Sequence, residues 1–440
     1  MCRMLPTQFR RSWLFLIGLG LLVPLSVCVG FLAFKIPAIN ERFAWRMDFA
    51  LTYLRNFVDP VEPIPTKLPK PHLRVVSQTS TPAPVSQSAM TEGQSPASLV
   101  TPDAADLYPT QTVMPTATWA PLPPAVSLPA PAWERQDINN CGPASLAMYL
   151  RFWGWDGDQA DISGLLKPIR KDRNVNVEEL VYYARIRAGW LQAEYRVGGD
   201  LELLKRLLAA GIPVMIEEGV LLEETYWPDD DHWAAHYFLL TGYDDQAQEF
   251  TGQDSFFGAD RKVDYQELDH NWQAFNRVYI LLFPPGSQAA VQNLLGEAWD
   301  VDVNRLRALE ASQSEVDAQP ENAFAWFNLG TNLVYFEHYD EAADAYDRAE
   351  ALGLPQRMYR YQFGPFMAYF HSLRTADLLT LAEYAMKRTP TSEETLLWQG
   401  WGFYRQGNKT TAVQNFYEAL EYHPGYEDAL YALDYVNNNP

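Results

Sequence analysis

The pattern of apolar and polar positions divides residues 132–285 into short helices and strands. It predicts helices near 141–153, 158–166, 176–188, 200–210 and 264–274. It predicts strands near 191–196, 213–217, 236–243, 248–253 and 276–283. Helices that pack on an antiparallel sheet bury one common core and form an α+β domain. We therefore expect residues 132–285 to fold as a mixed domain of helix and sheet.

A repeated pattern begins after residue 285, and we expect residues 286–440 to form an all-α domain. Small and aromatic residues recur there in a frame of about 34 residues. The two clear frames contain Trp326, Leu329, Gly330, Ala342, Tyr346 and Ala349, and then Gly400, Gly407, Ala412, Phe416, Ala419 and Pro424. A weaker frame between them contains Phe363, Gly364, Ala385 and Pro390. Residues 303–319 predict a leading half-repeat, and residues 427–437 predict a closing helix.

This repeated pattern resembles the tetratricopeptide family over about 130 residues. The resemblance implies stacked pairs of helices whose concave face binds a protein partner. A generic helical bundle is the alternative, but a bundle has no fixed repeat of this length.

An uncharged apolar run at the start of the chain indicates a membrane anchor. It extends from Trp13 to Phe34, and its 22 residues are enough to cross a bilayer as a helix. Arg10 and Arg11 precede the run, so the positive-inside rule places the N-terminus in the cytoplasm. We expect residues 1–35 to be a cytoplasmic tail and a single-pass anchor in the cell membrane, with the globular domains extracellular. A cleaved signal peptide is the competing interpretation.

Residues 36–131 are interpreted as a juxtamembrane segment followed by a linker. Sixteen of the chain's 31 prolines lie between residues 60 and 131, mixed with serine and threonine. Proline lacks the backbone donor and fixes φ, so this stretch favours an extended spacer without a core. The linker would then hold the globular domains away from the membrane.

The charge of the chain excludes one class of partner. Its 440 residues contain 34 basic and 55 acidic side chains, which gives a formal net charge of −21. Such a chain has no basic surface for a phosphate backbone, so we expect no nucleic-acid partner. No group of His, Cys and Asp residues has the spacing of a metal site, and we expect neither a metal nor another cofactor.

Candidate chemistry centres on Cys141, which is the only one of three cysteines outside the anchor region. It begins the segment Cys-Gly-Pro-Ala-Ser, whose proline and apolar spacing predict the start of a helix. The helix dipole and the unpaired amides at such a position favour a thiolate. Gln136 lies five residues earlier, and its side-chain amide could join the Cys141 backbone amide in an oxyanion hole.

A cysteine nucleophile needs a base and a group that orients the base. His236 starts a predicted core strand, and Asp254 ends the next strand, so an antiparallel pair of strands would bring the two side chains together. His232 lies among acidic loop residues, and His270 lies in a predicted helix. We expect both of them to be outside the catalytic set.

These residues together resemble the peptidase C39-like domains of the papain-like superfamily. The resemblance rests on Gln136, on the Cys141 segment, on Gly-Ile-Pro-Val at 211–214, on His236-Tyr237 with Gly-Tyr-Asp at 242–244, and on Asp254. It implies a cysteine peptidase in which Cys141 is the nucleophile, His236 the base, Asp254 the orienting group and Gln136 the oxyanion donor. Papain-like enzymes usually have this glutamine six residues before the cysteine.

The predicted function is a membrane-anchored extracellular cysteine peptidase with a peptide or protein substrate. The repeats would bind a protein partner or the substrate itself. Two alternatives stay open on the same fold: an inactive module that only binds peptides, and an amidase or acyltransferase that acts on cell-wall peptides.

Overall fold

The computed structural model describes positions 50, 51, 54, 57 and 58 and residues 121–167 and 175–438. The predicted anchor and nearly all of the predicted linker lie outside these residues. None of the helices in the described part of the chain is both long and apolar enough to cross a membrane.

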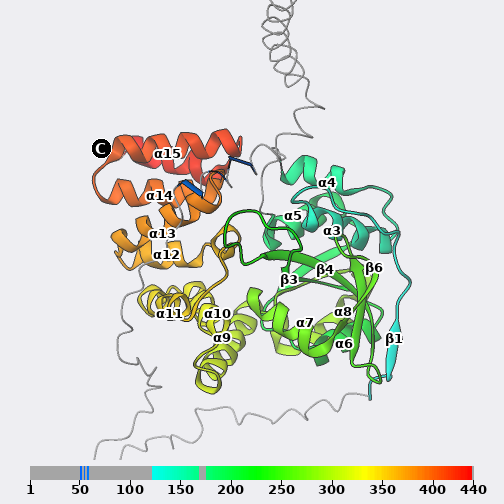
Figure 1. Cartoon of the computed structure of the whole chain (residues 1–440). Helices are drawn as coiled ribbons and strands as arrows, with labels where there is room; N and C mark the ends of the chain where they lie inside the picture. Colours follow the sequence, from blue (N-terminus) through cyan, green and yellow to red (C-terminus); the bar gives the residue numbers. More distant parts are fainter. Residues whose placement is uncertain (1–49, 52–53, 55–56, 59–120, 168–174, 439–440) are drawn as a thin grey trace, which may run out of the picture. The chain divides into compact units, whose positions relative to one another are not determined.

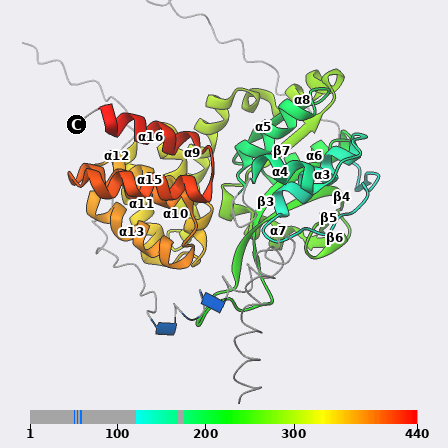
Figure 2. The same cartoon turned by 90° about the horizontal axis from the view of Figure 1, so that it is seen from above.

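In the described ranges, seven strands form one antiparallel sheet in which β2, β7, β3, β4, β5 and β6 follow one another across the sheet. β1 pairs with β4 at residues 242–244. The strands are β1 (Ala125–Ser127), β2 (Gln192–Arg196), β3 (Val214–Leu221), β4 (Trp233–Asp244), β5 (Glu249–Asp254), β6 (Gly258–Asp264) and β7 (Tyr279–Phe283). β3 and β4 form a long hairpin that extends past the neighbouring strands (Figure 2).

Helices cover both faces of this sheet (Figure 1). On one face lie α3 (Cys141–Phe152), α4 (Gln159–Leu166) and α5 (Val177–Arg187). On the other face lie α6 (Leu201–Ala209), α7 (Tyr265–Trp272) and α8 (Gln288–Leu295). Successive side chains of a strand point to opposite faces, so Leu239 packs with the core under α3, and Phe238 and Leu240 pack with the core under α6.

The elements predicted for this domain are confirmed to within a few residues, but two strands were missed. β1 lies inside the predicted linker, so the expectation of an extended spacer without a core is wrong for residues 125–127. Val126 pairs with Tyr243 and packs against the core, which offsets the entropy of ordering this short segment. β6 is the charged sequence Gly-Ala-Asp-Arg-Lys-Val-Asp at the edge of the sheet, where one buried residue, Val263, suffices.

A helical region follows the mixed domain (Figure 2). Its helices are α9 (Val301–Ala318), α10 (Ala323–Tyr335), α11 (Tyr339–Leu352), α12 (Gly364–His371), α13 (Thr375–Arg388), α14 (Glu393–Arg405), α15 (Lys409–Tyr422) and α16 (Glu427–Asn438). The predicted leading half-repeat corresponds to α9, and the predicted closing helix corresponds to α16. α10 packs with α11, α12 with α13, and α14 with α15.

Two glycines make the same contact in two of these helix pairs. A Cβ atom on Gly330 of α10 would come within 2.8 Å of the ring of Tyr346 on α11. A Cβ atom on Gly400 of α14 would come within 2.4 Å of the ring of Phe416 on α15. In each pair, the missing side chain lets an aromatic ring of the second helix pack directly on the first.

The packing is continuous across the expected domain boundary at residue 285. One apolar core extends from Leu146 in α3 to Ala385 in α13. Asn328 of α10 donates a buried hydrogen bond of 2.8 Å to the carbonyl oxygen of Gln273. The two parts therefore share buried surface, and the boundary between 132–285 and 286–440 stays a prediction.

Candidate active site

Cys141 is the first residue of α3, as the sequence predicted. Ser145, one turn later, donates a hydrogen bond of 3.0 Å to the carbonyl oxygen of Tyr237, which ties this turn to β4. A Cβ atom on Gly142 would lie 3.3 Å from Tyr237 and Leu180, so only a very small residue permits this close approach. The half-buried thiol is thereby held beside β4, which contains His236.

His236 and Asp254 meet across two neighbouring strands. β4 and β5 pair antiparallel with Phe238 opposite Asp254, and His236 is two residues from Phe238 on the same side of β4. The imidazole and carboxylate are diagonal neighbours, and 2.9 Å separates Nε2 of His236 from Oδ1 of Asp254. Both side chains are buried. The predicted contact is confirmed, although β4 begins at Trp233, three residues before the predicted start.

Asp254 receives more hydrogen bonds than the one from His236. Its Oδ1 atom accepts from the backbone amides of Phe256 and Phe257, each at 2.8 Å. Its Oδ2 atom accepts from Nη1 of Arg261 on β6 at 2.8 Å. The same Nη1 atom donates to Oε1 of Glu218 at 2.9 Å. These donors hold the carboxylate beside the imidazole and stabilise its charge.

The electrostatics of the site favour a thiolate beside an imidazolium. Burial alone would raise the pKa of the Cys141 thiol, but a hydrogen bond and the charge of His236, with the Tyr237 backbone amide, lower it below its ordinary value. Burial opposes the charge of His236, but Asp254 and then Cys141 raise the pKa of the imidazole from 6.5 to about 10. The thiol therefore loses its proton more readily than the imidazolium. Since Nε2 of His236 is hydrogen-bonded to Asp254, Nδ1 is the ring nitrogen that can interact with the Cys141 sulfur.

The carboxyl group of Asp254 is ionised in this arrangement. Burial would raise its pKa, but the charge and the hydrogen bond of His236, the Phe257 amide and Arg261 lower it well below 3.8. The directions of these pKa shifts favour a series of charges at the site: thiolate, imidazolium and carboxylate. This is the series that an activated cysteine nucleophile requires.

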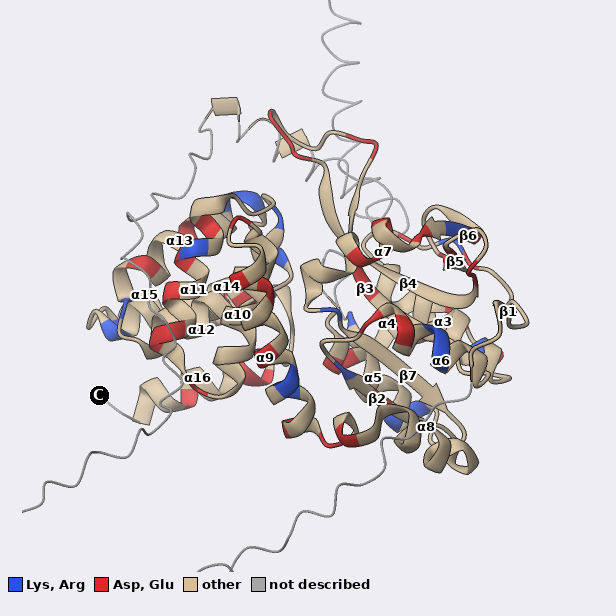
Figure 3. Ribbon diagram, turned by 90° about the horizontal axis from the view of Figure 1, so that it is seen from below, with Lys and Arg blue, Asp and Glu red and all other residues tan. Residues whose placement is uncertain are grey.

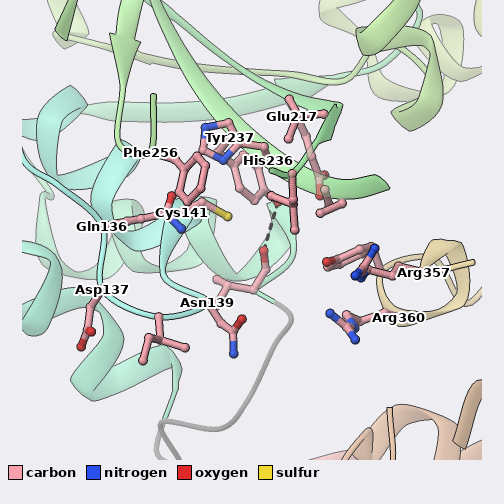
Figure 4. Close-up of a pocket in the computed structure, with 18 of the residues that line it drawn as sticks. Gln136, Asp137, Asn139, Cys141, Glu217, His236, Tyr237, Phe256, Arg357 and Arg360 are labelled. Atoms are coloured by element: carbon pink, nitrogen blue, oxygen red, sulfur yellow. Dashed lines mark hydrogen bonds between the residues drawn. The ribbon is translucent and has the colours of Figure 1, made fainter. Parts of the chain in front are cut away.

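Gln136 lies at the same cavity as Cys141 (Figure 4). Its Oε1 atom accepts a hydrogen bond of 2.9 Å from Ser255, and its backbone amide donates to the carbonyl oxygen of Ser255. Ser255 directly follows Asp254, so one turn orients both residues. With Oε1 occupied by Ser255, the Nε2 donor of Gln136 is the group left for a ligand.

A cavity of about 280 Å³ opens over these residues. In Figure 4, Gln136, Cys141, His236 and Phe256 gather on one side of it, and Arg357 and Arg360 lie on another.

The other two histidines of the domain do not line this cavity. Nδ1 of His232 contacts the Leu222 carbonyl oxygen at 2.9 Å, and His270 contacts Gln273. His232 thus lies in the loop between β3 and β4, and His270 lies in α7.

Three residues around the site were missed at the sequence level. Arg261 lies on the strand that was not predicted. Glu217 and Glu218 lie on β3 opposite Tyr237 and His236. Two adjacent acids inside the apolar strand Val-Met-Ile-Glu-Glu-Gly-Val-Leu were the available signal, because buried carboxyl groups are rare without a partner. Glu217 lines the cavity, and burial, followed by the nearby Cys141, raises the pKa of its carboxyl well above 4.5.

Among the described residues there is no cluster of three or more His, Cys, Asp and Glu side chains that could hold a metal ion.

The comparisons with known proteins find a family match for this part of the chain. Residues 127–280, roughly a third of the sequence, match the Peptidase_C39 like family. A proposed C39-like peptidase from Bacillus anthracis is 18% identical over 36% of this chain and 97% of its own, with a TM-score of 0.29. The cysteine protease xylellain from Xylella fastidiosa is 16% identical over 37% of this chain and 87% of its own, with a TM-score of 0.29.

A further solved structure is that of YrrB, described as a TPR protein with an unusual peptide-binding site. It is 18% identical over 33% of this chain and 89% of its own, with a TM-score of 0.18. No curated protein matches the sequence. The described chain thus combines a C39-like domain of mixed sheet and helix with a following helical region.

Proposed function

We propose that this protein is a cysteine peptidase whose catalytic residues are Cys141, His236, Asp254 and Gln136. One observation carries the proposal: a thiol at a helix N-terminus lines the same cavity as an imidazole that a buried aspartate contacts at 2.9 Å. The lowered pKa of the thiol supports turnover, because an inactive binding module has no need of an activated cysteine. The family match over 127–280 agrees with this chemistry.

The reaction follows from the positions of these groups. The Cys141 thiolate attacks the peptide carbonyl carbon, a C–S bond forms, and the carbonyl electron pair moves to oxygen. Cys141 is the first residue of α3, so its backbone N–H has no partner within the helix and can donate to this oxyanion together with Gln136. The His236 imidazolium then gives its proton to the departing amine nitrogen as the C–N bond breaks.

Hydrolysis of the thioester completes the cycle. Neutral His236 takes a proton from water, the resulting hydroxide attacks the acyl carbon, and the C–S bond breaks. The products are a peptide carboxylic acid, which loses its proton to the solvent, and the regenerated thiolate–imidazolium pair. Asp254 keeps its charge throughout and holds Nε2 of His236, so that Nδ1 stays directed at the sulfur.

The proposal includes the location and the role of the repeats. The basic flank before the apolar run at 13–34 supports a cell-membrane anchor with the enzyme outside the cell. The paired helices α10 to α15 and their glycine contacts support a tetratricopeptide array that binds a protein partner or substrate. External protease added to intact cells should release a fragment that contains 132–440. Protection of that fragment would contradict this orientation.

Turnover is tested with the purified full-length protein and a mixed-sequence peptide library, and new N-termini are identified by mass spectrometry. We expect cleavage by the wild type and none by Cys141→Ala. Intact binding of peptides without cleavage would favour the inactive module. Release of ammonia or acyl transfer without internal cleavage would favour the amidase or acyltransferase.

A further inference from the structure

The cavity beside Cys141 is built from both parts of the chain. Leu222, Glu224, Tyr226 and Trp227 line it from the loop 222–232 between β3 and β4. Arg357, Arg360 and Tyr361 line it from the segment between α11 and α12. These two groups are more than a hundred residues apart in sequence and contribute to one cavity.

The segment between α11 and α12 also holds the loop in place. Arg357 donates from Nη2 to Asp230 at 2.6 Å and from Nη1 to the carbonyl oxygen of Trp233 at 2.8 Å. The Arg357 and Asp230 side chains are 1% and 0% exposed, so this ion pair is fully withdrawn from water. Figure 3 shows the acidic positions along this loop and the basic positions of the helical region. A charge pair this deeply buried fixes the relative position of its two partners.

Gln356 adds a second set of contacts beside Arg357. Its Oε1 atom accepts from Nε1 of Trp227, and its Nε2 atom donates to the carbonyl oxygen of Asp229, both at 2.7 Å. Its backbone amide donates to Oδ2 of Asp231 at 2.7 Å. Two cations lie near the Trp227 ring, Arg357 at 4.2 Å and Arg388 at 4.9 Å from its centroid.

The loop needs such support because of its own backbone. Asp229 and His232 have φ values of 56° and 62°, in the left-handed region that residues with a side chain rarely adopt. Gln356 contacts the carbonyl oxygen of Asp229, and Arg357 contacts the side chain of Asp230 between them. Contacts from the helical region thus hold the loop in a conformation that its sequence alone does not favour.

The loop is also continuous with β4, the strand that contains His236. Trp233, whose carbonyl oxygen accepts from Arg357, is the first residue of β4, and His236 follows three residues later. The Trp233 ring stacks on Phe275 at 5.9 Å and meets Tyr361 edge-on at 6.1 Å.

We propose that the helical region forms one wall of the peptide-binding cleft, and that Gln356 and Arg357 position the loop 222–232 as the rest of that wall. The helices then act within the active site, in addition to any partner that they bind elsewhere. Gln356 and Arg357 are positioning residues: they act on the peptide through the loop and leave the chemistry at the sulfur to Cys141 and His236. The inference rests on the proposed function for one point, that the ligand is a peptide.

The chain offers a matched pair of variants for a test in the full-length protein. Gln356→Ala removes the side-chain contacts to Trp227 and Asp229. Gln362→Ala is the control, because Gln362 comes from the same segment but donates at 2.8 Å to the carbonyl oxygen of Ala274, away from the loop. The double variant Asp230→Asn with Arg357→Met removes the buried ion pair without leaving a lone charge.

Two measurements separate the loop's position from the chemistry. Amide hydrogen exchange of residues 222–232 should become about five- to tenfold faster in Gln356→Ala and stay unchanged in Gln362→Ala. Labelling of Cys141 by N-acetyl-tripeptide chloromethyl ketones should slow by about tenfold or more in Gln356→Ala and in the double variant. Labelling by chloroacetamide, which has no peptide to align, should keep its rate and its pH profile.

The outcomes are distinct. If amide exchange of residues 222–232 were as slow in Gln356→Ala as in Gln362→Ala, the proposal that Gln356 positions the loop would be overturned. Faster exchange with unchanged tripeptide labelling would overturn its role as a cleft wall, as would an equal slowing of tripeptide and chloroacetamide labelling. If the wild-type Cys141 reacted no faster with the tripeptide chloromethyl ketones than with chloroacetone, which has the same reactive group without a peptide, the proposed peptidase function and the peptide wall would both fail. The exchange data would still decide whether the helical region holds the loop.

Discussion

Asp254 on β5 holds His236 on β4 through a hydrogen bond of 2.9 Å, and it does so from a carboxylate that Arg261 and two backbone amides also bind. The orientation of the imidazole is therefore set by a rigid group whose own position does not depend on His236. This relationship makes the aspartate an orienting residue for the imidazole.

Asp254→Asn should lower kcat by about 10²–10⁴ with a much smaller change in KM, because an amide in this position no longer enforces the ring orientation or stabilises the imidazolium. The measurement is steady-state hydrolysis of a peptide cleaved by the wild type. Asp260→Asn is the matched control, since Asp260 accepts from Gln253 near the same edge of the sheet and does not contact His236. Equal losses in the two variants would point to disruption of the sheet instead.

The His236–Asp254 pair should give stability a recognisable pH dependence. In a Cys141→Ala background, Asp254 still raises the pKa of His236 above the unfolded value of 6.5. The stabilisation is then complete below pH 6.5 and is lost as the pH rises through the folded pKa. Urea unfolding at pH 6, 8 and 10 should show this decline, and His236→Gln in the same background should remove it. The same slope in both proteins would contradict the assigned charge state.

At acid pH the stability changes in the opposite direction, because here it decreases as the pH falls. The pKa of Asp254 is depressed by His236, so its contribution is present above the unfolded value of 3.8 and is lost as the pH falls further. Together the two limbs place the largest contribution of the pair between about pH 5 and pH 6.5.

Gln136→Ala should lower kcat by about 10²–10³ if its amide donates to the oxyanion. We expect the Cys141 titration to keep its midpoint, because the hydrogen bond and the charge of His236 are the main groups that lower the thiol pKa. Ser255→Ala should give a smaller loss, since Ser255 only orients the amide. Kinetics and thiol titration of both variants would check this, and a shifted titration in Gln136→Ala would contradict the oxyanion role.

The repeat frame makes a prediction about stability. Gly400→Ala should reduce the free energy of unfolding by about 1–3 kcal/mol, because the new methyl group would meet the ring of Phe416. Adding Phe416→Leu should recover part of the loss. Gly164→Ala is the control: its methyl group meets nothing within 4 Å in α4 and should be neutral or stabilising. Denaturant unfolding measures all of these variants, and additive effects in the double variant would contradict the contact.

Most of the C39-like domain could be predicted because its signals are local. The first residue of α3, the alternation along β4 and the end of β5 all follow from neighbouring residues, and they were enough to bring His236 and Asp254 together. β6 was missed because an edge strand needs few apolar residues. Arg261 lies on β6, so its role at the site was not predicted either.

The contacts between the helical region and the loop 222–232 had no local signal in the sequence. Arg357 pairs with Asp230 over 127 positions of sequence, and neither side chain lies in a motif. The proline-rich composition before residue 132 likewise concealed β1, which is ordered by its pairing with β4 and by the packing of Val126 against the core. Contacts of this kind depend on how finished elements pack, and the periodicity of a single segment does not contain that information.

The state of the Cys141 thiol tests the account most directly. The rate of alkylation of full-length protein by chloroacetamide is measured against pH, and mass spectrometry follows the peptide that contains Cys141, since the chain has two other cysteines. We predict a midpoint well below the ordinary value of about 8.5 in the wild type, and a higher midpoint in His236→Ala. A wild-type midpoint at the ordinary value that His236→Ala leaves unchanged would contradict an activated cysteine nucleophile.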